Sequence, residues 1–72
     1  NPNNGQFAVD MHGLNYKTGK LRVYDVTGRM VYTKELNGES KTDVRLQQAA
    51  PGIYILSITT DTGILNRKIH LE

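Results

Sequence analysis

Apolar and polar residues alternate with a period of two along most of this chain. From residue 6 to residue 11, for example, Phe7, Val9 and Met11 alternate with small or polar residues. This is the pattern of a β-strand that has one buried face and one face in water. The same alternation recurs farther along the chain, and it predicts strands over residues 6–11, 21–24, 30–36, 42–46, 53–60 and 64–71. A seventh strand would form if the region from Leu14 to Tyr16 also pairs.

Turn-forming residues separate these strands. Asp25-Val26-Thr27-Gly28 predicts a tight turn, because its glycine can adopt a positive φ angle. Asn37-Gly38 and Asp61-Thr62-Gly63 predict two more turns. The carboxylates of Asp25 and Asp61 lie in turns, where they can accept hydrogen bonds from nearby backbone N–H groups. Pro51-Gly52 predicts a corner before a strand, because proline cannot donate to a sheet ladder. No segment has the 3.6-residue period of a helix. We therefore expect an all-β fold, a small antiparallel β-sandwich of Ig-like type with a Greek-key connection.

The strand predicted over residues 53–60 carries apolar residues on both of its faces. Tyr54, Leu56 and Ile58 are expected to face the core, whereas Ile53 and Ile55 point to the opposite side. An exposed apolar pair marks an interaction site unless a loop or a neighbouring domain covers it, and both interpretations stay open. Pairing of another chain along an open edge strand is a further possibility. Either surface could join two isolated domains into a homodimer.

The length of 72 residues predicts one small domain. A chain this short buries only about 60% of its unfolded surface, so its stability is marginal. It has no cysteine, and no His and Cys cluster for a structural zinc ion. Its stability must come from a packed core or from attachment to a larger protein. Since the chain begins at Asn1 and not at Met, we interpret it as a piece of a longer protein, with residues 1–4 ending an interdomain linker and residues 5–72 forming the domain.

The charge distribution gives no indication of a nucleic-acid or membrane partner. Nine Lys and Arg against seven Asp and Glu give a formal charge of +2, and these charges are scattered along the chain. Arg67, Lys68 and His70 form a short basic patch, whereas nucleic-acid binding requires a broader stripe with aromatic residues. No apolar run is long enough to span a bilayer. We therefore expect no nucleic-acid partner and no direct membrane insertion.

Candidate residues for catalysis or metal binding are few. Asp10 and His12 have a spacing that could hold two metal ligands, but a polar solvent-facing side of a strand is the simpler interpretation. The other histidine, His70, is expected on the outward side of its strand. Ser40 and Ser57 are the only serines, and neither lies in a nucleophile-elbow motif. No Asp-rich calcium loop or Gly-rich phosphate loop occurs. We predict no catalytic residue, no metal and no cofactor.

Four short motifs follow one another along the chain. They are NPNNGQF at residues 1–7, VYDVTGRMV at 23–31, APGIYIL at 50–56 and KIHL at 68–71. Each motif alone is weakly specific, but together they extend over essentially the whole chain. In this order and spacing they resemble the opening, the middle hairpin, the late strand and the terminal strand of type A C-terminal sorting domains of the type IX (Por) secretion system.

The resemblance implies a transport label and not an enzyme. Such domains lie at the C-terminus of large secreted or surface proteins of Bacteroidetes, which cross the inner membrane by a separate N-terminal signal. The folded domain is then recognised by outer-membrane type IX translocon and shuttle proteins, and a sortase-like peptidase usually removes it. The implied location is the periplasm in transit, and then the cell surface or the medium together with the parent protein.

The resemblance also implies roles for particular residues. We expect the translocon to recognise the terminal strand, namely Lys68, Ile69, His70, Leu71 and Glu72. The acidic Glu72 is a departure, because the family often ends on aliphatic and basic residues. Residues expected to be critical for the fold are Gly5, Phe7, Asp25, Gly28, Arg29, Pro51, Gly52 and Tyr54. The possible exposed interaction patch consists of Ile53 and Ile55.

Three alternative functions compete with the sorting label. An adhesion or carbohydrate-binding β-sandwich predicts an exposed aromatic platform or a calcium loop, and the sequence has neither. An Ig-like spacer would allow the chain to continue beyond Glu72, whereas a sorting label must end the parent protein. A small enzyme would need a pocket that the strand pattern does not predict.

Overall fold

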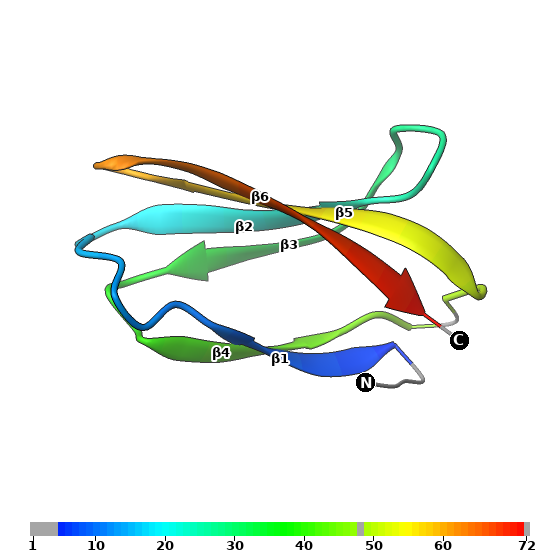
Figure 1. The fold of residues 1–72 in the computed structure, drawn as a ribbon, viewed down its shortest axis with the longest axis horizontal. Helices are drawn as coiled ribbons and strands as arrows, with labels where there is room; N and C mark the ends of the chain where they lie inside the picture. Colours follow the sequence, from blue (N-terminus) through cyan, green and yellow to red (C-terminus); the bar gives the residue numbers. More distant parts are fainter. Residues whose placement is uncertain (1–4, 48, 72) are drawn as a thin grey trace.

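The computed structural model describes residues 5–47 and 49–71, which form two β-sheets packed face to face. The six strands are β1 (Gln6–Asp10), β2 (Gly19–Tyr24), β3 (Met30–Leu36), β4 (Lys41–Arg45), β5 (Gly52–Thr60) and β6 (Gly63–Leu71). One sheet has the order β1-β4 and the other the order β3-β2-β5-β6, and all neighbours are antiparallel. Figure 1 shows the smaller sheet as a separate layer beside the larger one. The predicted small antiparallel β-sandwich is confirmed.

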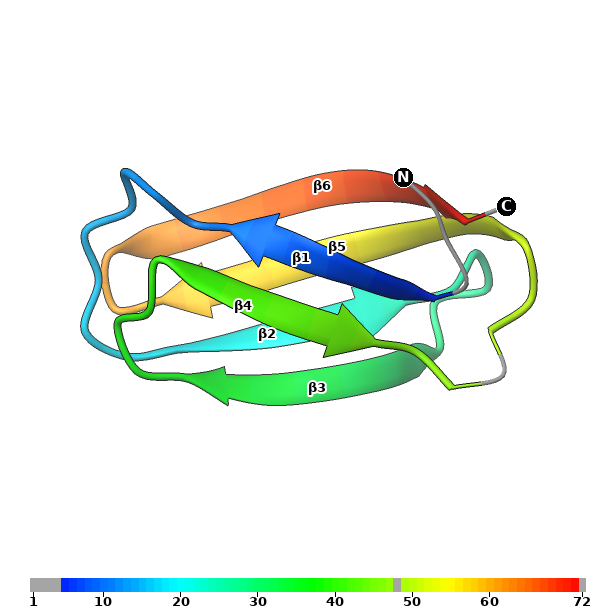
Figure 2. The same cartoon turned by 90° about the horizontal axis from the view of Figure 1, so that it is seen from below.

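The connections between the strands are of two kinds, hairpins within the larger sheet and crossings from one sheet to the other. β2 and β3 form one hairpin and β5 and β6 another, both within the four-stranded sheet. Between them the chain crosses to the other sheet as β4 and returns as β5 beside β2. This return to the first strand of the preceding hairpin is the Greek-key type of connection that was expected. Figure 2 shows β1 and β4 lying across the middle of the larger sheet, with β3 and β6 at its edges.

The segment from Leu14 to Tyr16, which would have formed a seventh strand by pairing, does not pair. This segment is an irregular connection between β1 and β2. At its start, the Leu14 N–H donates to the Met11 carbonyl at 3.0 Å. Directly after the segment, the backbone N–H groups of Lys17 and Thr18 donate to the Asp61 carboxylate. These bonds hold both ends of the segment in a loop conformation.

The core lies between the two sheets and follows the period-two pattern. In the register of the larger sheet, Leu21 stands opposite Ile58 and Val23 opposite Leu56, so these four side chains share the inner face. Fully burying a side chain of this size contributes about 1.5–3 kcal/mol. Tyr54, Leu56 and Ile58 face the core, as predicted. The buried apolar residues are Val9, Met11, Leu21, Val23, Leu36, Val44, Leu46, Tyr54, Leu56, Ile58 and Leu71.

The edge strands of the larger sheet each carry a basic residue on the inner side. Lys34 of β3 stands opposite Leu21, and Arg67 of β6 stands opposite Leu56. The Lys34 ammonium donates a 2.6 Å hydrogen bond to the hydroxyl of Thr42 on β4. Thr42 is buried, so this bond gives its hydroxyl a partner. Inward-pointing charges on edge strands hinder pairing with another chain. The fold therefore protects the two edges that the narrower sheet leaves uncovered.

Gly5 joins the start of β1 to the end of β4. The Leu46 N–H donates to the Gly5 carbonyl at 2.6 Å. The φ angle of Gly5 is +82°, and a Cβ atom there would lie 2.6 Å from the Leu46 carbonyl oxygen. Both the backbone conformation and this close approach require glycine.

Candidate functional site

Most of the residues that were predicted to be critical for the fold or to be recognised by the translocon lie at one end of the sandwich, although they are far apart in the sequence. The turn between β2 and β3 brings Asp25 and Arg29 there, and the connection from β4 to β5 brings Pro51. β6 ends at the same place, since Leu71 pairs with Gly52. We call this the motif end of the molecule, formed by residues 25–29, 49–54 and 68–71.

The turn between β2 and β3 is a tight hairpin loop, as predicted. The Gly28 N–H donates to the Asp25 carbonyl at 3.0 Å, and the Asp25 N–H donates to the Arg29 carbonyl at 2.9 Å. Gly28 has a φ angle of +91°, and the register shifts between Val23 and Tyr24. A turn that is followed by a glycine in the left-handed region, beside a shift in register, is typical of a three-to-four-residue hairpin loop with a β-bulge.

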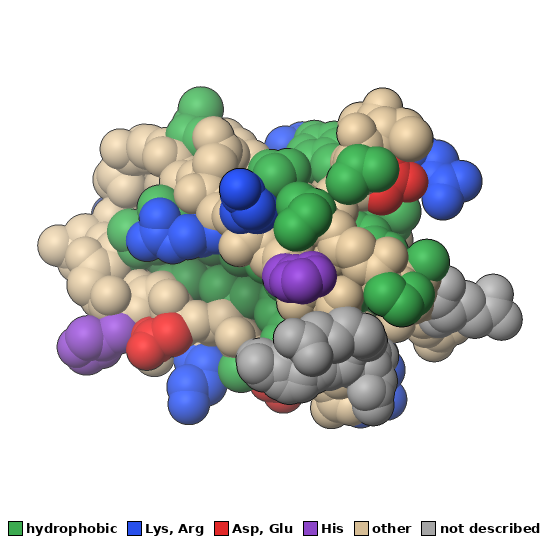
Figure 3. Space-filling view, turned by 45° about the vertical axis from the view of Figure 1, so that its right-hand side comes forward, with side chains coloured by type: hydrophobic (Ala, Val, Ile, Leu, Met, Phe, Trp, Pro, Cys, Tyr) green, Lys and Arg blue, Asp and Glu red, His purple; other side chains and the backbone are tan. Residues whose placement is uncertain are grey.

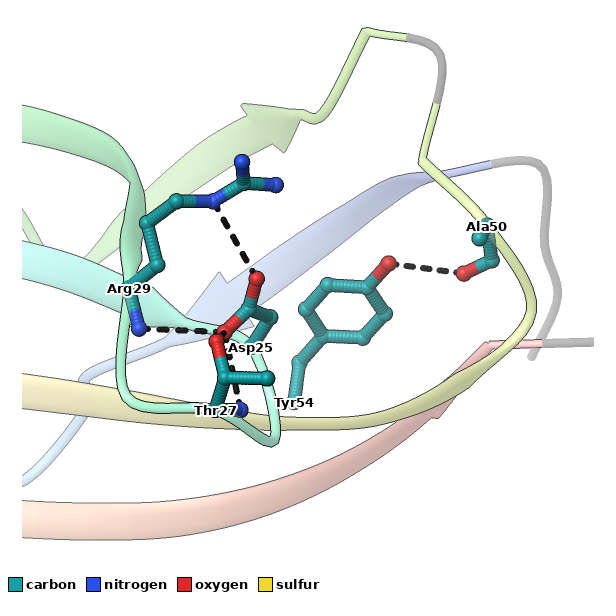
Figure 4. Close-up of polar contacts among 5 residues, drawn as sticks. All are labelled: Asp25, Thr27, Arg29, Ala50 and Tyr54. Atoms are coloured by element: carbon teal, nitrogen blue, oxygen red, sulfur yellow. Dashed lines mark hydrogen bonds and ion pairs between the residues drawn. The ribbon is translucent and has the colours of Figure 1, made fainter.

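The Asp25 carboxylate organises this turn. Its Oδ1 atom accepts hydrogen bonds from the Thr27 hydroxyl at 2.6 Å and from the Thr27 and Arg29 N–H groups at 3.0 Å each. Its Oδ2 atom lies 3.3 Å from Nε of Arg29. Figure 4 shows these contacts converging on one carboxylate. The hydrogen bond from the Thr27 hydroxyl, followed by the backbone donors and the guanidinium, lowers the pKa of Asp25.

Tyr54 fixes the corner at which the chain enters β5. Its ring is buried, and its hydroxyl donates a 2.7 Å hydrogen bond to the carbonyl of Ala50, four residues earlier (Figure 4). Ig-like sandwiches use such a tyrosine corner to hold a chain crossing between sheets. The bond gives the Ala50–Pro51–Gly52 corner a backbone anchor that proline, lacking an N–H, does not supply.

A groove of about 330 Å³ lies between the turn and the corner. Its walls include Val26, Arg29 and Val31 from the hairpin, together with Leu46, Pro51 and Tyr54. The Arg29 side chain is 77% exposed. In Figure 4 its two terminal nitrogens point away from Asp25. The groove thus combines apolar walls with one guanidinium.

The terminal strand and the Ile53–Ile55 pair form one surface. Residues directly opposite each other in a sheet share a face, and Lys68 stands opposite Ile55 while His70 stands opposite Ile53. Tyr24 flanks Ile55 on the other side. We call these five residues the outer-face patch. Figure 3 shows hydrophobic side chains at the surface beside basic ones at this end of the molecule.

The other residues of the terminal strand have different surroundings. Ile69 stands opposite Tyr54 on the inner face and is half-buried. Leu71 is only 2% exposed and belongs to the core. Glu72, also predicted to be recognised, lies outside the described residues, as do residues 1–4 of the predicted linker.

Asp10 and His12 form part of a turn. The Oδ1 atom of Asp10 accepts a 2.9 Å hydrogen bond from the His12 N–H, and both residues are exposed, as expected for a polar solvent-facing side. Over residues 5–47 and 49–71, no group of three or more His, Asp or Glu side chains is placed to hold a metal ion. The same residues contain no helix that is long and apolar enough to cross a membrane.

Hydrogen bonds that the sequence did not predict join the loops at the opposite end. Asp61 was expected to bond within its own turn, but its Oδ1 atom accepts the N–H groups of Lys17 and Thr18, more than 40 residues away, at 2.9 and 3.2 Å. These donors lower the pKa of Asp61. The Tyr16 hydroxyl donates to the Glu39 carbonyl at 2.7 Å. Burial, and then the nearby Glu39 carboxylate, raise the pKa of Tyr16.

The family of the chain follows from its sequence match. A protein family described as "Secretion system C-terminal sorting domain" matches residues 1–72, the whole chain. No curated protein and no solved structure matches it. The family match agrees with the four motifs, three of which the fold brings together at the motif end. The chain belongs to the C-terminal sorting domains of the Por (type IX) secretion system, which are non-catalytic signals for secretion.

Proposed function

We propose that the secretion machinery recognises the folded domain through the outer-face patch. The observation that supports this proposal most strongly is the register of β5 and β6. It places Lys68 and His70, from the terminal strand, on the same face as Ile53 and Ile55. Two surfaces that the sequence analysis treated separately are therefore neighbours. Ile69 and Leu71 face the other way and contribute by holding β6 in the sheet.

The chemistry of the patch suits a protein partner. Ile55 is 37% exposed, and exposed apolar side chains gathered at one place are characteristic of interaction sites. Lys68 and His70 lie beside the isoleucines and are exposed. Apolar contacts at the centre of an interface give affinity, whereas charged groups at its rim guide orientation and association. We expect the partner surface to be apolar with acidic groups around it.

We also propose the subtype of the domain, its partners, its cleavage site and the destination of the parent protein. The order of the four motifs supports type A within the family. The partners would be translocon and shuttle proteins of the outer membrane, and a sortase-like peptidase would cleave in the linker that ends at residues 1–4. The parent protein would pass through the periplasm and then reach the cell surface or the medium. The contacts of Gly5, Asp25, Gly28 and Tyr54 support their proposed importance for the fold, in which Phe7 also packs against the core.

A secretion assay with point variants tests the proposed surface. The chain is placed at the C-terminus of a reporter that carries an inner-membrane export signal, in a Bacteroidetes host with a working type IX system. Ile55→Asp changes the patch, and Thr59→Asp is the matched control on the same face of β5, since Thr59 stands opposite Lys20 and Ile64. We expect the Ile55→Asp reporter to stay folded in the periplasm and the Thr59→Asp reporter to be secreted.

Two other outcomes would count against the proposal in different ways. Secretion of both variants at the unmodified level would show that the patch is not the recognised surface. Retention of the reporter with the unmodified chain would show that the chain does not direct secretion in this host.

A further inference from the structure

Arg29 differs from the other motif residues at this end because its side chain stands mostly in water. It is 77% exposed, and the ion pair of its Nε atom with Asp25 is 3.3 Å long. Such exposed pairs add little to stability. The turn is already held by Oδ1 of Asp25, which bonds to Thr27 and to the Arg29 backbone. The fold therefore uses the backbone of Arg29 and has little need of its guanidinium.

Val26 is a second residue at this place that the fold does not explain. It occupies the centre of a tight turn, where Gly, Asn, Asp and Ser are favoured. Val26 is 75% exposed, and Val31 on the adjoining strand is 37% exposed. Both valines line the same groove as Arg29. Exposed apolar side chains next to a guanidinium, around a groove, provide a surface for a ligand with both apolar and anionic parts.

We propose that this groove binds an extended peptide segment of a partner protein, in which an Asp or Glu carboxylate lies beside an aliphatic side chain. A guanidinium presents a fork of donors that matches the two oxygens of a carboxylate. The aliphatic side chain would contact Val26, Val31 and Pro51. The volume of about 330 Å³ is at the lower end of the range for ligand sites, which suits one or two side chains.

The lining of the groove favours a peptide over a sugar. Its polar side chains are Asp25, Arg29 and Gln47, and the Asp25 carboxylate is occupied by the turn. A sugar needs several converging polar groups or an exposed aromatic platform, and the Tyr54 ring is only 7% exposed. The walls contributed by Val26, Val31, Leu46 and Pro51 are apolar.

This inference rests on the proposed function for the identity of the partner, which would be a component of the secretion machinery. Ile53 lines the groove and also belongs to the outer-face patch. One partner can therefore cover both surfaces at once. The binding chemistry of the groove is independent of that identity and can be tested alone.

The first test is a titration of the isotope-labelled 72-residue chain, followed by NMR, with the peptides acetyl-Leu-Glu-Val-amide and acetyl-Leu-Gln-Val-amide. We expect the Glu peptide to shift the amide signals of residues 26–31, 49–50 and 52–53 and to bind at least about fivefold more tightly than the Gln peptide, because only the former pairs with the guanidinium. Arg29→Gln should remove this difference. Arg67→Gln, which removes one positive charge from the opposite edge of the sheet, should keep it.

Three results of the titration would overturn the inference. They are equal binding of the two peptides, loss of the difference in Arg67→Gln as well, and no shift at all in the groove. Inorganic phosphate serves as a further probe. If phosphate alone reproduces the shifts at the same concentration, the groove binds a phosphate group and the assignment to a peptide is wrong.

The second test connects the groove to secretion, using the reporter described above. We expect Arg29→Gln to keep the reporter folded but in the periplasm, Arg29→Lys to restore secretion only in part, and Arg67→Gln to be secreted normally. Normal secretion of Arg29→Gln would overturn the role of the groove in recognition. If the unmodified chain also fails to direct secretion, the proposed function fails, whereas the titration still decides whether the groove binds a carboxylate.

Discussion

At the scale of single residues, two polar side chains hold the motif end together. Asp25 satisfies donors of the β2–β3 turn, and Tyr54 satisfies the Ala50 carbonyl at the corner before β5. Each of these hydrogen bonds stabilises a loop that is not paired in either sheet, by about 1 kcal/mol. The surfaces proposed for recognition are built on these two loops and on the strands beside them.

Removing only the Tyr54 hydroxyl should weaken the corner without emptying the core. Tyr54→Phe keeps the ring but loses the hydrogen bond to Ala50, so we expect the free energy of unfolding to fall by about 1 kcal/mol. Tyr32→Phe is the matched control, because the Tyr32 hydroxyl bonds to none of the described residues and its ring packs at the side of the core. Chemical denaturation of both variants measures the difference. Equal effects would contradict the tyrosine corner.

Acid should destabilise both ends of the domain. A hydrogen bond from the Thr27 hydroxyl lowers the pKa of Asp25. Backbone N–H groups have the same effect elsewhere: that of Asn37 lowers the pKa of Glu39, and that of Lys17 lowers the pKa of Asp61. A carboxyl group whose pKa is lower in the folded state stabilises the fold fully above its unfolded pKa and loses this effect as the pH falls through the folded pKa. The ordinary values are 3.8 for aspartate and 4.5 for glutamate. We therefore expect the melting temperature to fall when the pH is lowered below about 4.5.

The variant Asp61→Asn isolates one of these carboxylates. It should lower the melting temperature at pH 7 and make the loss of stability in acid shallower, because a group that cannot ionise contributes no pH dependence of its own. Thermal unfolding followed by circular dichroism between pH 3 and pH 7 gives both quantities. An acid transition as steep as that of the unmodified chain would contradict the assigned role of Asp61.

At the scale of elements, the alternation of faces along β6 separates two roles within one strand. Lys68 and His70 lie on the outer face, whereas Ile69 and Leu71 lie on the inner face. Deleting the last five residues would mix the two effects, since it removes a core side chain together with the exposed ones. Point substitutions can distinguish them.

Leu71→Ala should lower the stability of the domain, whereas Lys68→Ala should reduce secretion and leave the stability almost unchanged. Truncating a buried leucine costs about 2–5 kcal/mol, which is a large part of the stability of a small domain. Lys68 is exposed, and its substitution should change the free energy of unfolding by about 0.5 kcal/mol or less. Urea unfolding and the reporter assay together check this. A Lys68→Ala variant that is both stable and fully secreted would argue against a role for Lys68 in recognition.

At the scale of the whole molecule, the two ends of the sandwich differ in how they are held. At the motif end, the side chains of Asp25 and Tyr54 form hydrogen bonds with residues close to them in the sequence. At the other end, Asp61 and Tyr16 reach across more than 20 residues to join separate loops. With no cysteine in the chain, the core and these loop contacts replace disulfides as the source of stability.

The sequence predicted local features well and long-range ones poorly. The strands, the Gly28 turn and the Pro51-Gly52 corner depend on period and on local backbone preferences, so they could be read from neighbouring residues. The pairing of β1 with β4 depends on which strands meet in space, and no local pattern encodes it. For the same reason the Asp61 contacts and the groove beside Arg29 were missed, because each joins residues from segments that only the fold brings together.

Site-specific photo-crosslinking from the outer face of β5 during secretion tests most directly whether the outer-face patch is recognised. A photoreactive amino acid replaces Ile55 in one reporter and Thr59 in another, and crosslinked partners are identified by mass spectrometry in the type IX host. We expect crosslinks from position 55, but not from position 59, to a component of the secretion machinery. Equal crosslinking from both positions, or none from position 55 while the reporter is exported, would contradict it.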